Sequence, residues 1–182
     1  MVLAVRMNET AASALQPPAI VDPPPAVPRL SQGLRDKLAG GLAYNEGAWI
    51  FAEHVGQWVA APASASAAIA EMGWQDLSGY EWHVNAFHLE DHAPVQVADL
   101  DGQPRISHED QIVLLRLGLV VADGVFGLVR VLPEPVPVRC VIGANETCAV
   151  FRFHQIRSGD DWIDGPLKQD GPDMMVVVDR HP

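Results

Sequence analysis

The order of hydrophobic and polar positions along the chain predicts short strands joined by tight turns, with few helices. Apolar Trp82 is followed by polar His83 and Asn85 at alternating positions, and this period of two predicts a strand over residues 80–91. Trp82 and Phe87 would then lie on opposite faces of that strand, because successive side chains point to opposite sides.

Turn sequences divide most of the other hydrophobic positions into hairpins. Asp-Gly is a favoured two-residue turn between strands, and glycine with small or polar residues forms slightly longer turns. The expected hairpins are residues 95–107 around Asp101-Gly102, residues 118–132 around Asp123-Gly124, and residues 136–157 around Gly143-Ala144-Asn145. Further strands are expected at 49–53, 57–60 and 174–179, with a helix over 48–61 as the alternative to the first two.

Helical spacing of apolar residues predicts about three short helices. Ser31 precedes one such run and Gly40-Gly41 follows it, and these are typical first and last signals of a helix. Ser107 predicts the start of a second helix, which is expected to continue through Leu117. An alanine-rich helix is expected within residues 64–73.

These elements together predict a single α+β domain with a largely antiparallel sheet over residues 30–182. The chain lacks the alternation of strand and helix that is typical of doubly wound folds. The first 29 residues differ, since six prolines lie between positions 17 and 28. Proline has no amide donor and fixes φ, so residues 1–29 are expected to be a disordered leader, within which Met7 is an alternative start to Met1.

Composition narrows the class of protein. The chain has 182 residues, of which 48% are hydrophobic and 19% are charged, as in a globular domain. It has no run of 18 apolar residues and no signal-peptide pattern, so neither a membrane span nor secretion is expected. Two cysteines make no disulfide framework, and a cytoplasmic location follows. Few lysines beside abundant alanine, valine, proline and arginine point to a GC-rich bacterial genome.

Motifs of the common enzyme classes are absent from the sequence. There is no phosphate-binding glycine loop, no Gly-x-Gly-x-x-Gly, no His-Glu-x-x-His and no Gly-x-Ser-x-Gly. No cofactor is therefore expected, and a binding protein is favoured over an enzyme.

His83, His88 and His154 are the candidate residues for chemistry. A helical turn would bring His88 and His92 to one face, as in a metal site, whereas a strand sends His83 and His88 to opposite faces, so no metal site is expected. His154 and Arg152 share one face of their expected strand. There they could bind an anion, or act as a general acid with an electrostatic clamp.

Cys140 and Cys148 lie on the two arms of the third hairpin. A three-residue turn would place them opposite one another, and a four-residue turn would put them out of register. Free cysteine is among the most buried residue types, so both thiols are expected to be reduced and buried, on one face with Val138, Ile142 and Val150.

Charge is unevenly distributed along the chain. Its 12 basic and 23 acidic residues give a net charge of −11, so nucleic acid and anionic membranes are not expected partners. Residues 71–110 hold nine acids and a single base, Arg105, whereas residues 111–158 hold five arginines and three acids. A solvated face that keeps the protein soluble explains such a segment, and so does a docking surface for a basic partner.

The favoured interpretation is a small acidic bacterial protein that binds a basic protein partner, as an inhibitor, an immunity-type protein or an escort. The alternative is a small enzyme or ligand-binding domain that uses His83, His88 or His154 in a sheet-lined pocket. The contacts expected with a partner are Glu81, Trp82, Phe87, Glu90, Asp91, Asp99 and Asp101.

Overall fold

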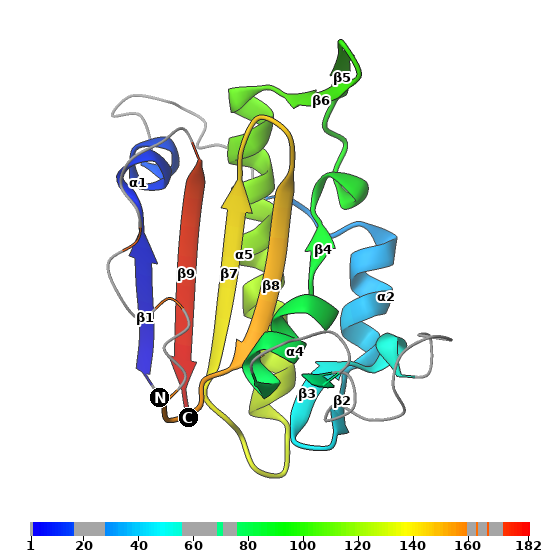
Figure 1. The fold of residues 1–182 in the computed structure, drawn as a ribbon, viewed down its shortest axis with the longest axis vertical. Coiled ribbons are helices and arrows are strands. Elements are labelled where there is room, and N and C mark those ends of the chain that lie inside the picture. The colour runs from blue at the N-terminus through cyan, green and yellow to red at the C-terminus, as the bar shows by residue number, and fades with distance from the viewer. Residues whose placement is uncertain are drawn as a thin grey trace.

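A five-stranded antiparallel sheet forms the centre of the molecule (Figure 1). The computed structural model describes residues 2–16, 28–55, 69–70, 76–159, 163, 167 and 173–182. Across the sheet the strands are β1 (Val2–Met7), β9 (Met174–His181), β7 (Val138–Ala144), β8 (Ala149–Gln155) and β4 (Phe87–His88). The expected α+β class with a largely antiparallel sheet is confirmed.

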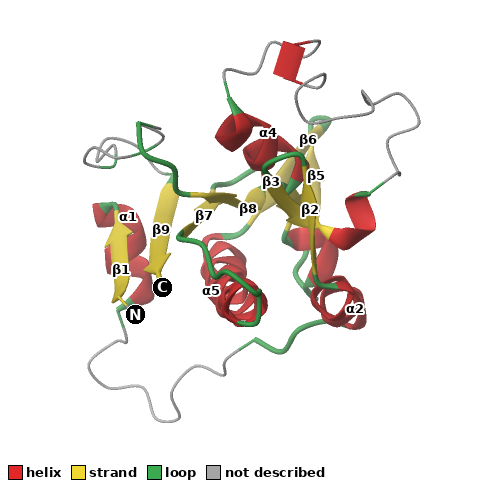
Figure 2. Ribbon diagram, turned by 90° about the horizontal axis from the view of Figure 1, so that it is seen from below, coloured by secondary structure: helices red, strands yellow, loops and turns green. Residues whose placement is uncertain are grey.

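Helix α5 (His108–Arg130) covers one face of this sheet (Figure 2). The other helical elements are α1 (Glu9–Leu15), α2 (Gln32–Gly40), α4 (Leu77–Val84) and the short 3₁₀ turns η1 (Ala52–His54) and η2 (Glu90–His92). Two separate hairpins are formed by β2 (Leu42–Asn45) with β3 (Ala48–Phe51), and by β5 (Val97–Leu100) with β6 (Gln103–Ile106). α2 packs beside α5, and α4 packs against β8 and β3.

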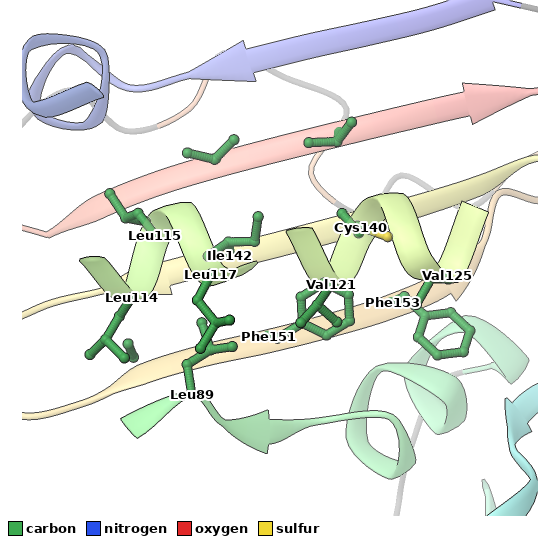
Figure 3. Packing of buried hydrophobic residues seen from close by; sticks show 14 of the residues in the cluster. Leu89, Leu114, Leu115, Leu117, Val121, Val125, Cys140, Ile142, Phe151 and Phe153 are labelled. Atoms are coloured by element: carbon green, nitrogen blue, oxygen red, sulfur yellow. The ribbon is translucent and has the colours of Figure 1, made fainter. Parts of the chain in front are cut away.

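The hydrophobic core lies between α5 and the sheet (Figure 3). Alternate residues of a strand point to the same side, so Cys140 and Ile142 of β7 and Phe151 and Phe153 of β8 all face α5. The buried α5 residues of this cluster include Leu114, Leu117, Val121 and Val125. Burial of such side chains stabilises the fold by about 1.5–3 kcal/mol each.

Helix α5 is longer than the sequence pattern predicts. The expected end near Leu117 and the expected hairpin around Asp123-Gly124 are both wrong, because buried residues recur every three or four positions as far as Val129. Gly124 lies inside the helix, where an added Cβ atom would stand 2.7 Å from Leu38 Cδ1. This glycine therefore permits the close approach of α2 and does not form a turn.

By length and composition, α5 could also span a membrane, and it is the one helix of the described residues that could do so. Half of its apolar stretch is buried inside the molecule, as in the core helix of a soluble protein. The absence of a membrane span therefore stays a prediction.

Residues 77–84 form helix α4, so the strand expected over 80–91 is wrong except at β4. Asp76 caps the helix by accepting a hydrogen bond from Gly79 N (2.7 Å). The polar residues Glu81 and Asn85 are buried and bind backbone groups of β3 and β8. Buried Glu81 and Asn85, with exposed His83 between them, thus produced an alternation resembling that of a half-buried strand.

Residues 2–16 differ from the disordered leader expected at the start of the chain. β1 pairs with β9 over its whole length of six residues. Asn8 then caps α1 by accepting a hydrogen bond from Ala11 N, and also accepts one from Met175 N, both at 3.0 Å. The prediction of disorder is therefore wrong for residues 2–16. The apolar run of β1 pairs with β9 at the edge of the sheet, although prolines follow it in the sequence. The proline-rich residues 17–27 lie outside the described residues.

The β7–β8 hairpin is present as expected, with the longer of the two possible turns. Ala144 pairs with Ala149 and leaves a four-residue turn, so Cys140 lies opposite Phe153 and out of register with Cys148. Both thiols are free, and Cys140 is buried whereas Cys148 is half-buried at the turn. Val150 lies on the face opposite Cys140, which corrects the expected shared face.

Two sequence expectations fall largely outside the described residues. The strand at 57–60 lies outside them, and only residues 69–70 of the helix expected within 64–73 are described, as helical. The strand expected at 49–53 is represented by β3, which gives way to η1.

Candidate functional site

The β5–β6 hairpin projects from the end of the molecule at which α5 begins (Figure 1). Its two strands pair with each other and with no other described strand. At its base, Ile106 is buried in the core and donates its N–H to the Glu146 carbonyl (2.8 Å), and Arg105 forms an ion pair with the Glu146 carboxylate. A two-stranded hairpin buries little surface by itself, so the residues beyond this base are exposed on both faces.

Two large apolar side chains of the hairpin face water. Val97 is 46% exposed and Leu100 is 58% exposed. Strands with free edges usually carry charges rather than apolar side chains, because apolar edges invite association. Exposed apolar side chains on two free strand edges are therefore typical of a surface that binds another molecule.

Acidic side chains occupy the tip of the hairpin, the start of α5 that follows it and the turn η2 that precedes it. Asp99 accepts a hydrogen bond from Gly102 N (2.9 Å), and Asp101 lies exposed beside it. Arg105, the single base of residues 71–110, is already paired with a carboxylate. We call the following set the acidic hairpin end: Asp91, Asp99, Asp101, Glu109 and Asp110. The β5–β6 hairpin thus carries exposed Asp99 and Asp101 on the same short element as exposed Val97 and Leu100.

Glu81 was expected to contact a partner but lies fully buried at the other end of the sheet. Its carboxylate accepts hydrogen bonds from Trp49 N (2.6 Å) and Gln155 N (2.7 Å) and pairs with Arg157 (2.8 Å). Burial raises the pKa of the Glu81 carboxyl, and Arg157 opposes that change. Glu81 thus joins α4 to β3 and β8, and its position inside the molecule corrects the expectation.

Glu90, Trp82 and Phe87 also make internal contacts. Glu90 Oε2 accepts a hydrogen bond from Ala149 N (3.0 Å), which ties η2 to the start of β8. The Trp82 ring lies 6.1 Å from the ring of His154, and the Phe87 ring packs among core aromatic rings. Of the seven contacts expected from the sequence, the three aspartates are the ones exposed to solvent.

The three candidate histidines make separate contacts. His83 Nδ1 lies 2.7 Å from the Gly79 carbonyl oxygen in its own helix, and His88 Nδ1 lies 2.9 Å from Glu90 Oε1. His154 is buried on the face of β8 opposite α5. Within the described parts of the chain, no three histidine, cysteine or acidic side chains are grouped so that they could hold a metal ion.

His154 and Arg152 do lie on one face of β8, as the alternation predicts. Arg139 of β7 lies opposite both His154 and Asp179 in the sheet register, and its guanidinium forms a two-point ion pair with Asp179 (2.7 and 2.9 Å). The Arg152 guanidinium lies over the Trp82 ring at 5.0 Å. The sequence analysis missed this buried row. The signal for Arg139 is that it is the one charged residue in the otherwise apolar strand β7.

A second polar cluster missed by the sequence analysis surrounds Lys37. The Lys37 side chain is 8% exposed, lies 5.1 Å from the centroids of two phenylalanine rings, and pairs with Glu53. Burial, and then the charge of Lys37, lower the pKa of His54 and of His92 from 6.5. The available signal was that Lys37 is three residues from Leu34, on the buried side of α2.

The buried row and the Lys37 cluster satisfy their charges internally, whereas the acidic hairpin end presents charges and apolar side chains to solvent. Access therefore favours the hairpin as the candidate site. Comparison with protein-family models, with curated proteins and with solved structures found no match for this chain.

Proposed function

We propose that this chain is a protein-binding module that engages a basic partner through its acidic hairpin end. One observation carries the proposal: the β5–β6 hairpin exposes Val97 and Leu100 beside Asp99 and Asp101. The carboxylates attract a basic surface, and the apolar side chains become buried in the complex.

The two kinds of side chain serve different stages of binding. Clustered charge accelerates the encounter of oppositely charged surfaces, and salt screens it over a Debye length of about 10 Å at 0.1 M. Burial of an exposed apolar side chain contributes up to about 1.5–3 kcal/mol and slows dissociation. Charge changes at Asp99 and Asp101 should therefore alter the association rate, and changes at Val97 and Leu100 the dissociation rate.

An inhibitor, an immunity-type protein or an escort in the bacterial cytoplasm would use such a surface, because each needs a stable body with a projecting contact element rather than a reactive group. His83, His88 and His154 make separate contacts and do not form one cluster, which makes the enzyme alternative the weaker one. A partner would meet the hairpin first, since the hairpin extends beyond the body (Figure 1).

The test compares two variants of equal charge change. D99K/D101K reverses two hairpin charges, and D123K/E134K reverses two exposed acids outside the acidic hairpin end. Proteins captured from the source cells on the wild-type chain are identified and purified. Their association rates with all three forms are then measured from low to high salt. We expect D99K/D101K to slow association about tenfold at low salt, with D123K/E134K within about twofold of wild type.

A V97S/L100S variant tests whether burial of the apolar side chains holds the complex together. We expect faster dissociation with an unchanged association rate. The proposal is wrong if D99K/D101K and D123K/E134K slow association equally. A variant that combines D99K/D101K with V97S/L100S should lose the partner. The proposal is also wrong if this variant binds every captured protein as strongly as the wild type does.

A further inference from the structure

A pocket of about 400 Å³ lies between α5 and the segments that flank η2 and α2. Apolar side chains form most of its wall, and two arginines complete it. The apolar residues are Pro28, Ala93, Pro94, Val113 and Leu117, and the arginines are Arg29 and Arg116. The pocket is built from three segments that are far apart in the sequence, so the fold brings both arginines to the wall of one pocket.

The two arginines differ from those cations of this acidic protein that pair with carboxylates. Arg105, Arg139 and Arg157 each form an ion pair with a carboxylate. Within the described residues, neither the Arg29 side chain nor the Arg116 side chain has a hydrogen bond or ion pair, and no carboxylate lines the pocket. Two cations in a chain with a net charge of −11 thus face the same apolar pocket without an acidic neighbour in its wall.

We propose that this pocket binds a small amphipathic anion, in which a carboxylate or phosphate group is joined to an apolar body. Guanidinium groups bind both kinds of anion through paired N–H donors, and they do so better than an ammonium group does. The apolar wall can bury a hydrocarbon body, which contributes to affinity. A highly hydrated anion without such a body gains no affinity from this wall. A volume of about 400 Å³ is within the range of small-molecule sites.

The pocket lies apart from the residues used in the hairpin proposal, so the two proposals can fail separately. None of Val97, Leu100, Asp99 and Asp101 lines it. Removal of the two arginine charges should therefore leave binding of a basic protein partner intact.

The test uses four probes of known chemistry, measured by titration calorimetry or by NMR shifts. Octanoate and octyl phosphate combine an anion with an apolar body, octanol has the body alone, and inorganic phosphate has the charge alone. We expect one of the two amphipathic anions to bind at least about tenfold more tightly than octanol and inorganic phosphate. The comparison of octanoate with octyl phosphate identifies the anionic group.

Variants assign the binding to this pocket. R29Q/R116Q removes both pocket charges, and R35Q/R130Q removes two charges from arginines that do not line it. We expect R29Q/R116Q to weaken binding about tenfold or more and R35Q/R130Q to change it less than about twofold. A V113D variant should also abolish binding, because it adds a carboxylate to the wall.

Three results would overturn the proposal. The first is that neither amphipathic anion binds, and the second is that octanol binds as tightly as the anions. The third is that R29Q/R116Q and R35Q/R130Q weaken binding equally, since the effect would then come from net charge and not from this pocket.

Discussion

His54 and His92 lie beside the buried ammonium of Lys37, and their titration should affect stability. Burial is the main cause that lowers the pKa of both imidazoles from 6.5, and the charge of Lys37 adds to it. In the unfolded chain both groups return to about 6.5. As the pH falls through that value, the unfolded chain takes up protons before the folded chain does, so the folded state loses stability.

We therefore expect the free energy of unfolding in urea to fall as the pH is lowered from about 7.5 to about 5.5, and to fall less in H54Q/H92Q. The control H108Q/H181Q changes two exposed histidines and should keep the wild-type dependence. If H54Q/H92Q had the same pH dependence as the wild type, the two imidazoles would not be the groups responsible.

The burial of charged residues could not be predicted from the sequence. A charge is expected at the surface by default, because burial without a partner costs several kcal/mol. The partner that makes burial of Glu81 possible is Arg157, 76 residues later, and no local pattern connects them. Asp99 and Asp101 are exposed in the hairpin that was predicted from the short Asp101-Gly102 turn.

At the scale of elements, two glycines of α5 allow a matched test of how the helix packs on the sheet. A Cβ atom at Gly118 would stand 2.6 Å from Ile142 Cγ2, whereas one at Gly127 would meet nothing within 4 Å. We expect G118A to destabilise the protein by about 1–3 kcal/mol, because the Ile142 side chain must shift to admit the methyl group. G127A should stabilise it by about 0.5–1 kcal/mol, since alanine favours helix. Urea denaturation measures both, and equal effects of the two substitutions would contradict the packing described here.

Elements that depend on adjacent residues were predictable, and elements that depend on distant ones were not. The β5–β6 and β7–β8 hairpins and β9 follow from turn chemistry and β-branched runs. The prediction of a turn at Asp123-Gly124 was wrong because helical packing over the 23 residues of α5 outweighs the local preference of Asp-Gly for a turn. Helix α4 was not predicted, because its buried polar side chains bind backbone groups of β3 and β8. Nothing in the local sequence shows that these strands lie nearby.

In the whole molecule, the acidic hairpin end and the two chain ends lie at opposite ends of the sheet (Figure 1). The class of fold could be predicted from composition and turns, but the order of strands could not, because β1 and β9 come from opposite ends of the chain. The hairpin site was predictable in part. Its aspartates stood out by charge, whereas Val97 and Leu100 gave no signal, since exposure of an apolar residue is set by the fold.

The pairing of β1 with β9 leads to the last prediction, which concerns a chain that begins at Met7. That chain would lack nearly all of β1, together with the contact of Arg6 with Asp179 (3.6 Å). The edge of β9 would then be left without its partner strand, and free edges pair with other chains.

We expect the shortened chain to be about 2–4 kcal/mol less stable in urea, from the loss of several backbone hydrogen bonds at about 0.5–1.5 kcal/mol each. We also expect it to self-associate when examined by light scattering. An L3S variant, which changes an exposed side chain of β1 and keeps the strand, is the control and should remain close to wild type. A shortened chain that is as stable as the full chain and equally monodisperse would show that β1 contributes nothing to the sheet, and that the disordered leader inferred from the prolines extends to the first residue after all.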